Sequence, residues 1–146
     1  MVKSFFRLFV GFLFSMACFS FFLFSTAKTT LPAEGDYTFY LYSKSSDAQI
    51  TTVPKDYAPV FSLLHRAQIT GERSVLTDDP RSIEEILSSL GGTLLFVEEC
   101  GDVTSYYCYA DGLSSPVFLN GTAVNLHLAV RGNTVCMGTP LIFGGF

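Results

Sequence analysis

An alternation of apolar and polar residues near the C-terminus places the strongest constraint on the fold of this chain. In residues 123–131, AVNLHLAVR, apolar residues occupy every second position: Val124, Leu126, Leu128 and Val130. Successive side chains of a β-strand point to opposite faces, so this period predicts a strand over 123–130 with one face in the core. Gly132-Asn133 is a turn signal, and a second run, TVCMGT (134–139), follows it. The segment therefore predicts an antiparallel pair of strands.

A helix signature lies in the middle of the chain. In TDDPRSIEEILSSLGGT, residues 77–93, four apolar residues have the i, i+3, i+4, i+7 spacing of one helix face: Ile83, Ile86, Leu87 and Leu90. We expect Asp78 or Asp79 to cap this helix, Pro80 to lie in its first turn and Gly91-Gly92 to end it. The pattern predicts a helix over 79–90.

The remaining patterned segments read as strands. Further strands are predicted over 36–43, 48–53, 67–76, 93–100, 103–110 and 117–119, and residues 60–66 resemble a helix start. The tail GTPLIFGGF is expected to finish the sheet and to bury its apolar residues on the domain. A helix followed by a meander of strands indicates an α+β fold, in which one main helix packs on one face of an antiparallel sheet.

The first 27 residues have the composition of an export segment. Lys3 and Arg7 precede an uncharged apolar run, residues 8–24, and Ser25 and Ala27 supply the small residues that signal peptidases require. The run is also at the short end of membrane-spanning length, which leaves an uncleaved anchor as the alternative. Either way, this segment engages the membrane and the rest of the chain is expected to lie outside the cytoplasm. We therefore divide the chain into a signal peptide or anchor (1–27), a linker (28–35) and one α+β domain (36–146).

The charge of the exported part argues against nucleic acid as a partner. Residues 28–146 contain thirteen acidic and seven basic residues, a net charge of −6. Nucleic-acid binding requires clustered Lys and Arg. Motifs for phosphate, metal or hydrolase sites are also missing from the sequence, so no metal or cofactor is expected.

A polar row on the C-terminal strand is the first candidate binding site. The alternation places Asn125, His127 and Arg131 on the face opposite the helix-packed core. This row is either a binding surface or an ordinary solvated sheet face. The aromatic runs YTFYLY (37–42) and SYYCY (105–109), which includes Tyr106, could add contact area of the kind that interfaces favour, or could be ordinary core packing.

The carboxylates and cysteines suggest little catalytic chemistry. Glu98 and Glu99 are neighbours in a predicted strand and point to opposite faces, which excludes a shared acid/base site. A two-residue turn at Gly101-Asp102 would place Cys108 opposite Leu95. Leu95 and Cys100 are an odd number of residues apart, so Cys100 and Cys108 would lie on opposite faces of the sheet and could not form a disulfide. A pairing of Cys136 with either remains open. A Cys nucleophile with His127 as its base has suitable residue types but no supporting motif.

The closing stretch of the chain, residues 124–142, consists of VNLHLAVR, a turn and a segment that ends in GTPLI. It resembles the C-terminal end of the exported YwmB-like family of spore-forming Gram-positive bacteria. That resemblance implies a TATA-box-binding-like fold and an N-terminal export segment, and it supplies no catalytic residues. The function expected from these observations is a non-catalytic domain that binds a protein or cell-envelope component. The alternative is an extracytoplasmic Cys/His-dependent hydrolase.

Overall fold

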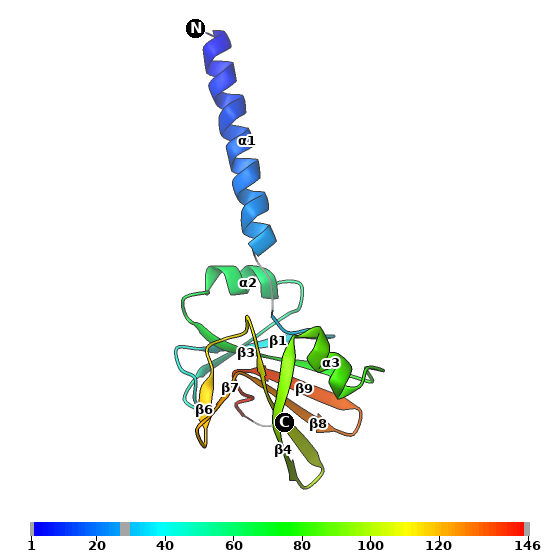
Figure 1. Ribbon diagram of the computed structural model, residues 1–146. Helices are drawn as coiled ribbons and strands as arrows, with labels where there is room; N and C mark the ends of the chain where they lie inside the picture. Colours follow the sequence, from blue (N-terminus) through cyan, green and yellow to red (C-terminus); the bar gives the residue numbers. More distant parts are fainter. Residues whose placement is uncertain (1, 27–29, 145–146) are drawn as a thin grey trace.

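The computed structural model describes residues 2–26 and 30–144, and three helices and nine strands lie within them (Figure 1). The helices are α1 (Val2–Thr26), α2 (Ala58–Leu64) and α3 (Ile83–Ser89). The strands are β1 (Tyr37–Leu41), β2 (Gln49–Val53), β3 (Ile69–Thr77), β4 (Gly92–Cys100), β5 (Val103–Ala110), β6 (Val117–Leu119), β7 (Thr122–Val124), β8 (Leu126–Arg131) and β9 (Thr134–Thr139).

Seven of these strands form one antiparallel sheet in the order β2-β1-β3-β9-β8-β5-β4. The other two, β6 and β7, form a separate hairpin. The predicted α+β class with an antiparallel sheet is therefore confirmed. The last strand of the chain, β9, lies in the middle of the sheet between β3 and β8.

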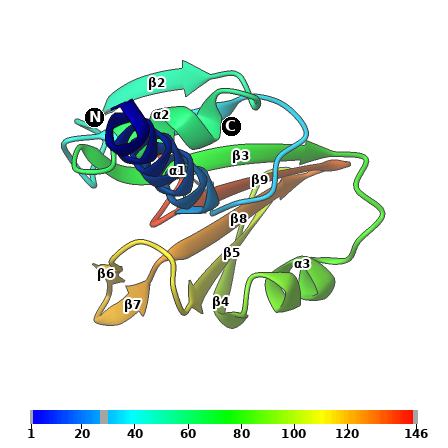
Figure 2. The ribbon, with the colours of Figure 1, turned by 90° about the horizontal axis from the view of Figure 1, so that it is seen from above.

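Helices α2 and α3 cover the same face of the sheet, which we call the helix face (Figure 2). Ile86 and Leu87 of α3 are buried against Leu126 and Leu128 of β8, as the strand alternation predicts. Beside them, the ring of Phe61 in α2 stacks on Phe39 of β1 at 5.1 Å. Two adjoining apolar clusters under the two helices thus form the core.

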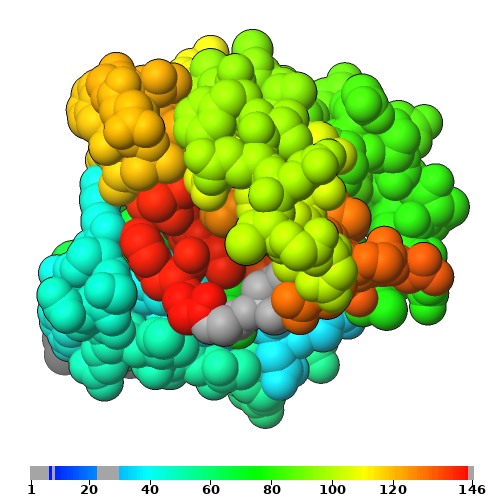
Figure 3. Space-filling model, turned by 90° about the horizontal axis from the view of Figure 1, so that it is seen from below, coloured from blue at the N-terminus to red at the C-terminus, as the bar shows by residue number. Residues whose placement is uncertain are grey.

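The C-terminal tail crosses the centre of the opposite face, which we call the tail face (Figure 3). The Tyr40 hydroxyl donates to the Phe143 carbonyl and accepts from the Phe143 N–H, both at 3.0 Å. Pro140 is buried, and Leu141 to Phe143 are half-buried. The prediction that the tail buries its apolar residues on the domain is confirmed for residues 140–143, but the prediction that it finishes the sheet is wrong beyond Thr139, because residues 140–144 form no strand. Strand β1 is consequently buried on both faces.

Helix α3 begins later than the sequence predicted. Its N-cap is Ser82, whose hydroxyl accepts from the Glu85 N–H at 3.2 Å while the Glu85 carboxylate accepts from the Ser82 N–H at 2.7 Å. Asp78 and Asp79 are occupied elsewhere, because Asp78 binds Asn133 and Asp79 binds Arg81. The predicted aspartate cap was wrong, and Pro80 precedes the helix instead of lying in its first turn, whereas the predicted end of the helix at Gly91 is correct.

Two strand predictions also need correction. A bulge between Leu94 and Phe96 places Leu94, and not Leu95, opposite Cys108. The single strand predicted over 123–130 is interrupted at Asn125, so that its first residues belong to the β6–β7 hairpin and the rest to the large sheet.

Helix α1 extends away from the sheet, with exposed apolar side chains such as Phe14 and Phe21 (Figure 1). Over the described part of the chain, no helix is long and apolar enough to cross a membrane. The proposed cleavage position after Ala27, and residues 28 and 29 of the predicted linker, lie outside the described residues. The described part of that linker has no helix or strand, yet Leu31 and Ala33 are buried, so it packs on the domain.

Candidate functional site

Three aromatic rings from three neighbouring strands stack on the tail face. Phe96 of β4, Tyr107 of β5 and His127 of β8 occupy matching register positions across the sheet. The Phe96 and Tyr107 ring centroids are 4.5 Å apart with an interplanar angle of 18°, and Tyr107 and His127 are 4.5 Å apart at 13°. We call these residues the aromatic row. The prediction that His127 lies on the face opposite the helix-packed core is confirmed.

His127 forms the inner end of the aromatic row, beside the C-terminal tail. Its Nδ1 accepts a long hydrogen bond from the Ile142 N–H at 3.4 Å. Its Nε2 is buried and has no hydrogen-bond partner among the described residues. Burial lowers the pKa of His127 to about 4. The imidazole is therefore neutral at pH 7, with its proton on Nε2, because Nδ1 is the acceptor.

The outer end of the aromatic row borders a shallow pocket of about 370 Å³. Phe96, Glu98 and Tyr107 form one wall, and the β6–β7 hairpin forms the other through residues 118–120. The hairpin presents Phe118, which is 72% exposed. Burial, and secondarily the Glu98 carboxylate, raise the pKa of Tyr107. An accessible aromatic surface thus lies next to one carboxylate, an arrangement suited to binding rather than to proton transfer.

Asn125 does not belong to this surface, contrary to the predicted polar row. Asn125 is 2% exposed, and its side chain bonds both backbone groups of Ala110: the Ala110 N–H donates to Oδ1, and Nδ2 donates to the Ala110 carbonyl, each at 2.8 Å. Nδ2 also donates to the Ser114 carbonyl at 3.3 Å. The amide replaces strand pairing where the chain passes from β7 to β8. Because the Asn125 amide is hydrogen-bonded to the backbone, it is not available to bind a ligand.

Arg131 and Tyr106 also lie apart from the aromatic row. Arg131 is exposed at the end of β8, where its Nε is 3.1 Å from Oδ2 of Asp102 in the β4–β5 turn. Tyr106 points to the helix face, because it pairs with Leu128 and packs on the α3 cluster. Of the four predicted site residues, His127 alone is in the aromatic row. The sequence pattern did not predict Phe96 or Phe118 as site residues. The face on which Phe96 lies depends on the bulge in β4, and the position of Phe118 depends on where the β6–β7 hairpin packs.

The cysteines are all free thiols, and the two in the domain core are in unreactive environments. Burial raises the pKa of Cys108 to about 12 and that of Cys136 to about 11. A cysteine nucleophile reacts as an accessible thiolate. Cys100 is exposed at the end of β4 and lies on the opposite face from Cys108, as predicted. Among the described residues, no group of His, Cys, Asp or Glu could hold a metal ion.

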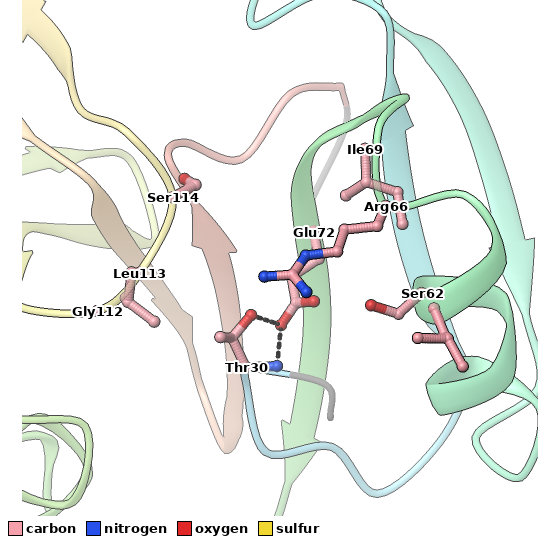
Figure 4. A pocket seen from close by; sticks show the side chains of 9 residues that line it. Thr30, Ser62, Arg66, Ile69, Glu72, Gly112, Leu113 and Ser114 are labelled. Carbon is pink, nitrogen blue, oxygen red and sulfur yellow. Dashed lines mark hydrogen bonds between the residues drawn. The ribbon is translucent and has the colours of Figure 1, made fainter. Parts of the chain in front are cut away.

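A second pocket, of about 290 Å³, lies on the helix face beside Glu72 (Figure 4). Glu72 is 4% exposed, and its Oε1 accepts from the Thr30 N–H, the Thr30 hydroxyl and the Leu31 N–H at 2.6–2.8 Å. Burial raises the pKa of Glu72, although these hydrogen bonds oppose the shift. Figure 4 shows Arg66 reaching over the carboxylate. Glu72 therefore ties the segment after α1 to β3, and sequence patterns did not identify it.

Comparison of the chain with protein-family models, with curated proteins and with solved structures finds no match.

Proposed function

We propose that residues 36–146 form an exported, non-catalytic domain that binds a protein or cell-envelope component through the aromatic row and the β6–β7 hairpin. The observation that carries this proposal is the convergence of Phe96, Tyr107 and Phe118 on one accessible pocket. Aromatic side chains are enriched at protein interfaces because they bury a large area at small conformational cost. The apolar segment 8–24 and the small residues Ser25 and Ala27 support export.

The net charge of −6 over residues 28–146 favours a partner other than nucleic acid. Membership of the YwmB-like family, and a TATA-box-binding-like arrangement, remain predictions from the resemblance of residues 124–142. The hydrolase is the less supported alternative, because the thiols of Cys108 and Cys136 are buried. Labelling of a cysteine by a thiol reagent that depends on His127 would favour that alternative.

The binding proposal can be tested by capture from cell-envelope extracts with the tagged full chain. Phe118→Ser removes the most exposed ring of the site without opening a core cavity, and we expect it to reduce recovery of a specifically captured component at least tenfold. Tyr57→Ser is the matched control, because Tyr57 is 68% exposed but lies at the start of α2. Equal capture by the wild type and Phe118→Ser, or equal loss in both variants, would contradict the proposal.

A further inference from the structure

Strand β4 forms one edge of the large sheet and has a free outer side. It pairs with β5 alone, so every second residue directs its N–H and C=O groups away from the sheet. The strand is nine residues long, whereas β2 at the other edge has five and is mainly polar. Such an edge can pair with another strand.

The side chains of β4 do little to prevent such pairing. Leu94, Leu95 and Val97 are 45%, 39% and 44% exposed in the middle of the strand. Proline and lysine, which commonly protect edges, do not occur between Gly92 and Cys100. The two charged residues, Glu98 and Glu99, lie near one end. The edge therefore combines unpaired backbone groups with an apolar centre and an acidic end.

We propose that a second copy of this chain pairs with β4 in the antiparallel direction, around a two-fold axis between Leu95 and Phe96. In this register Leu94 of one copy faces Val97 of the other, and Glu98 faces Thr93. The acidic ends then lie at opposite ends of the interface. A parallel pair in the same register would place Glu98 beside its own copy, which like-charge repulsion disfavours.

The bulge in β4 is what makes this register possible. Directly opposite residues of an antiparallel pair point to the same face. Leu94 and Val97 are three residues apart and would point to opposite faces in a regular strand. The bulge between Leu94 and Phe96 corrects this: Leu94 pairs with Cys108 and Val97 with Tyr106, both of which face the helix core. Thr93 and Glu98 correspondingly share the tail face, opposite Tyr109 and Ser105.

One pair of strands buries less than the ~1,200 Å² of a stable interface, so we expect a dimer that forms at raised concentration. The contact involves the edge of the sheet, and it does not depend on the binding role proposed for Phe118. The dimer would join two seven-stranded sheets into one continuous sheet.

Cysteine cross-linking in cells tests the register directly. In the full chain carrying Cys18→Ser, Cys100→Ser and Cys108→Ala, which removes the native thiol opposite Leu94, we introduce Leu94→Cys and Val97→Cys singly and together. The double variant should give an oxidised product with the mass of two chains, because directly opposite Cα atoms are ~5 Å apart. Each single variant should give at least tenfold less, since the bulge leaves Leu94 and Val97 two pairing positions apart, which places two copies of one position ~8 Å apart, beyond disulfide reach. No dimer from the double variant, equal cross-linking by the singles, or a product containing another protein would overturn the proposal.

Sedimentation of the full chain in detergent over a hundredfold concentration range provides a second measurement. Leu95→Lys should abolish the dimer, because it places a charge beside the axis on an already exposed position. Ile50→Lys is the matched control, since Ile50 is 53% exposed on the opposite edge strand, β2, and should leave the dimer unchanged. A chain that is monomeric throughout, or a dimer that survives Leu95→Lys, would overturn the proposal.

Discussion

At the scale of single residues, the same two-residue period led to opposite outcomes for His127 and Asn125. His127 lies on the predicted face, and the period determined this because β8 is regular around it. Asn125 lies where the chain leaves one sheet for another, and its amide binds the backbone of Ala110. The two-residue alternation therefore predicts the sheet face of a side chain only when the residue lies inside one continuous strand.

His127 should make folding stability depend on pH. The pKa of a histidine in the unfolded chain is about 6.5, whereas burial lowers the pKa of His127 in the folded chain to about 4. Between these values the unfolded chain binds a proton that the folded chain does not, so the free energy of unfolding should decrease as the pH falls from 6.5 towards 4. Through His127, the free energy of unfolding should be about 3 kcal/mol higher above pH 6.5, where the imidazole is neutral in both states, than below pH 4, where it is protonated in both.

Urea unfolding of the wild type and His127→Gln at half-unit steps from pH 7.5 to 4 would measure this effect. The difference in the free energy of unfolding between the two proteins should narrow as the pH falls. The comparison cancels groups that titrate in both proteins, including Glu72, whose raised pKa gives stability the opposite pH dependence. A difference that stays constant across this range would contradict the buried neutral imidazole.

At the scale of elements, the sequence predicted the existence of α3 but not its start. The candidate cap Asp78 has a φ of 55° and binds Asn133 in the β8–β9 turn, a contact between residues far apart in the chain. Ser82 and Glu85 have the spacing of a capping box, a local signal that was available in the sequence. Competition among several possible caps was decided by tertiary contacts.

Replacing Ser82 should weaken the start of α3. Ser82→Ala removes the hydroxyl that accepts from the Glu85 N–H, and we expect the free energy of unfolding to fall by about 1 kcal/mol. Ser88→Ala is the matched control, because Ser88 is exposed within the same helix and alanine favours helices. Thermal and urea unfolding would measure both variants. Equal stability of Ser82→Ala and the wild type would show that the capping box contributes nothing.

At the scale of the whole molecule, the chain consists of an apolar helix and a domain whose first segment is held by Glu72. Thr30 and Leu31 bind that buried carboxylate, and Leu31 also packs in the core. If the chain is cleaved after Ala27, as predicted for a signal peptide, the domain keeps all of these contacts. Processing should therefore leave the fold intact.

Mass spectrometry of the intact protein from membrane and extracellular fractions would test export. We expect a mature chain that begins at Lys28, and Ala27→Phe should block its formation because signal peptidase needs a small residue there. A full-length chain retained in the membrane fraction would favour the anchor. A full-length chain confined to the cytoplasm would contradict export in either form.

The sequence by itself determined the antiparallel α+β class, the main helix and the face on which His127 lies. These properties follow from periodicity and turn residues, which act over a few neighbouring positions. Tertiary structure decided the strand order, the bulge beside Leu95, the burial of Asn125 and the convergence of Phe96, Tyr107 and Phe118. Each of these depends on pairing or packing between distant segments, where several registers satisfy the same local pattern and only the contacts of the complete fold distinguish them.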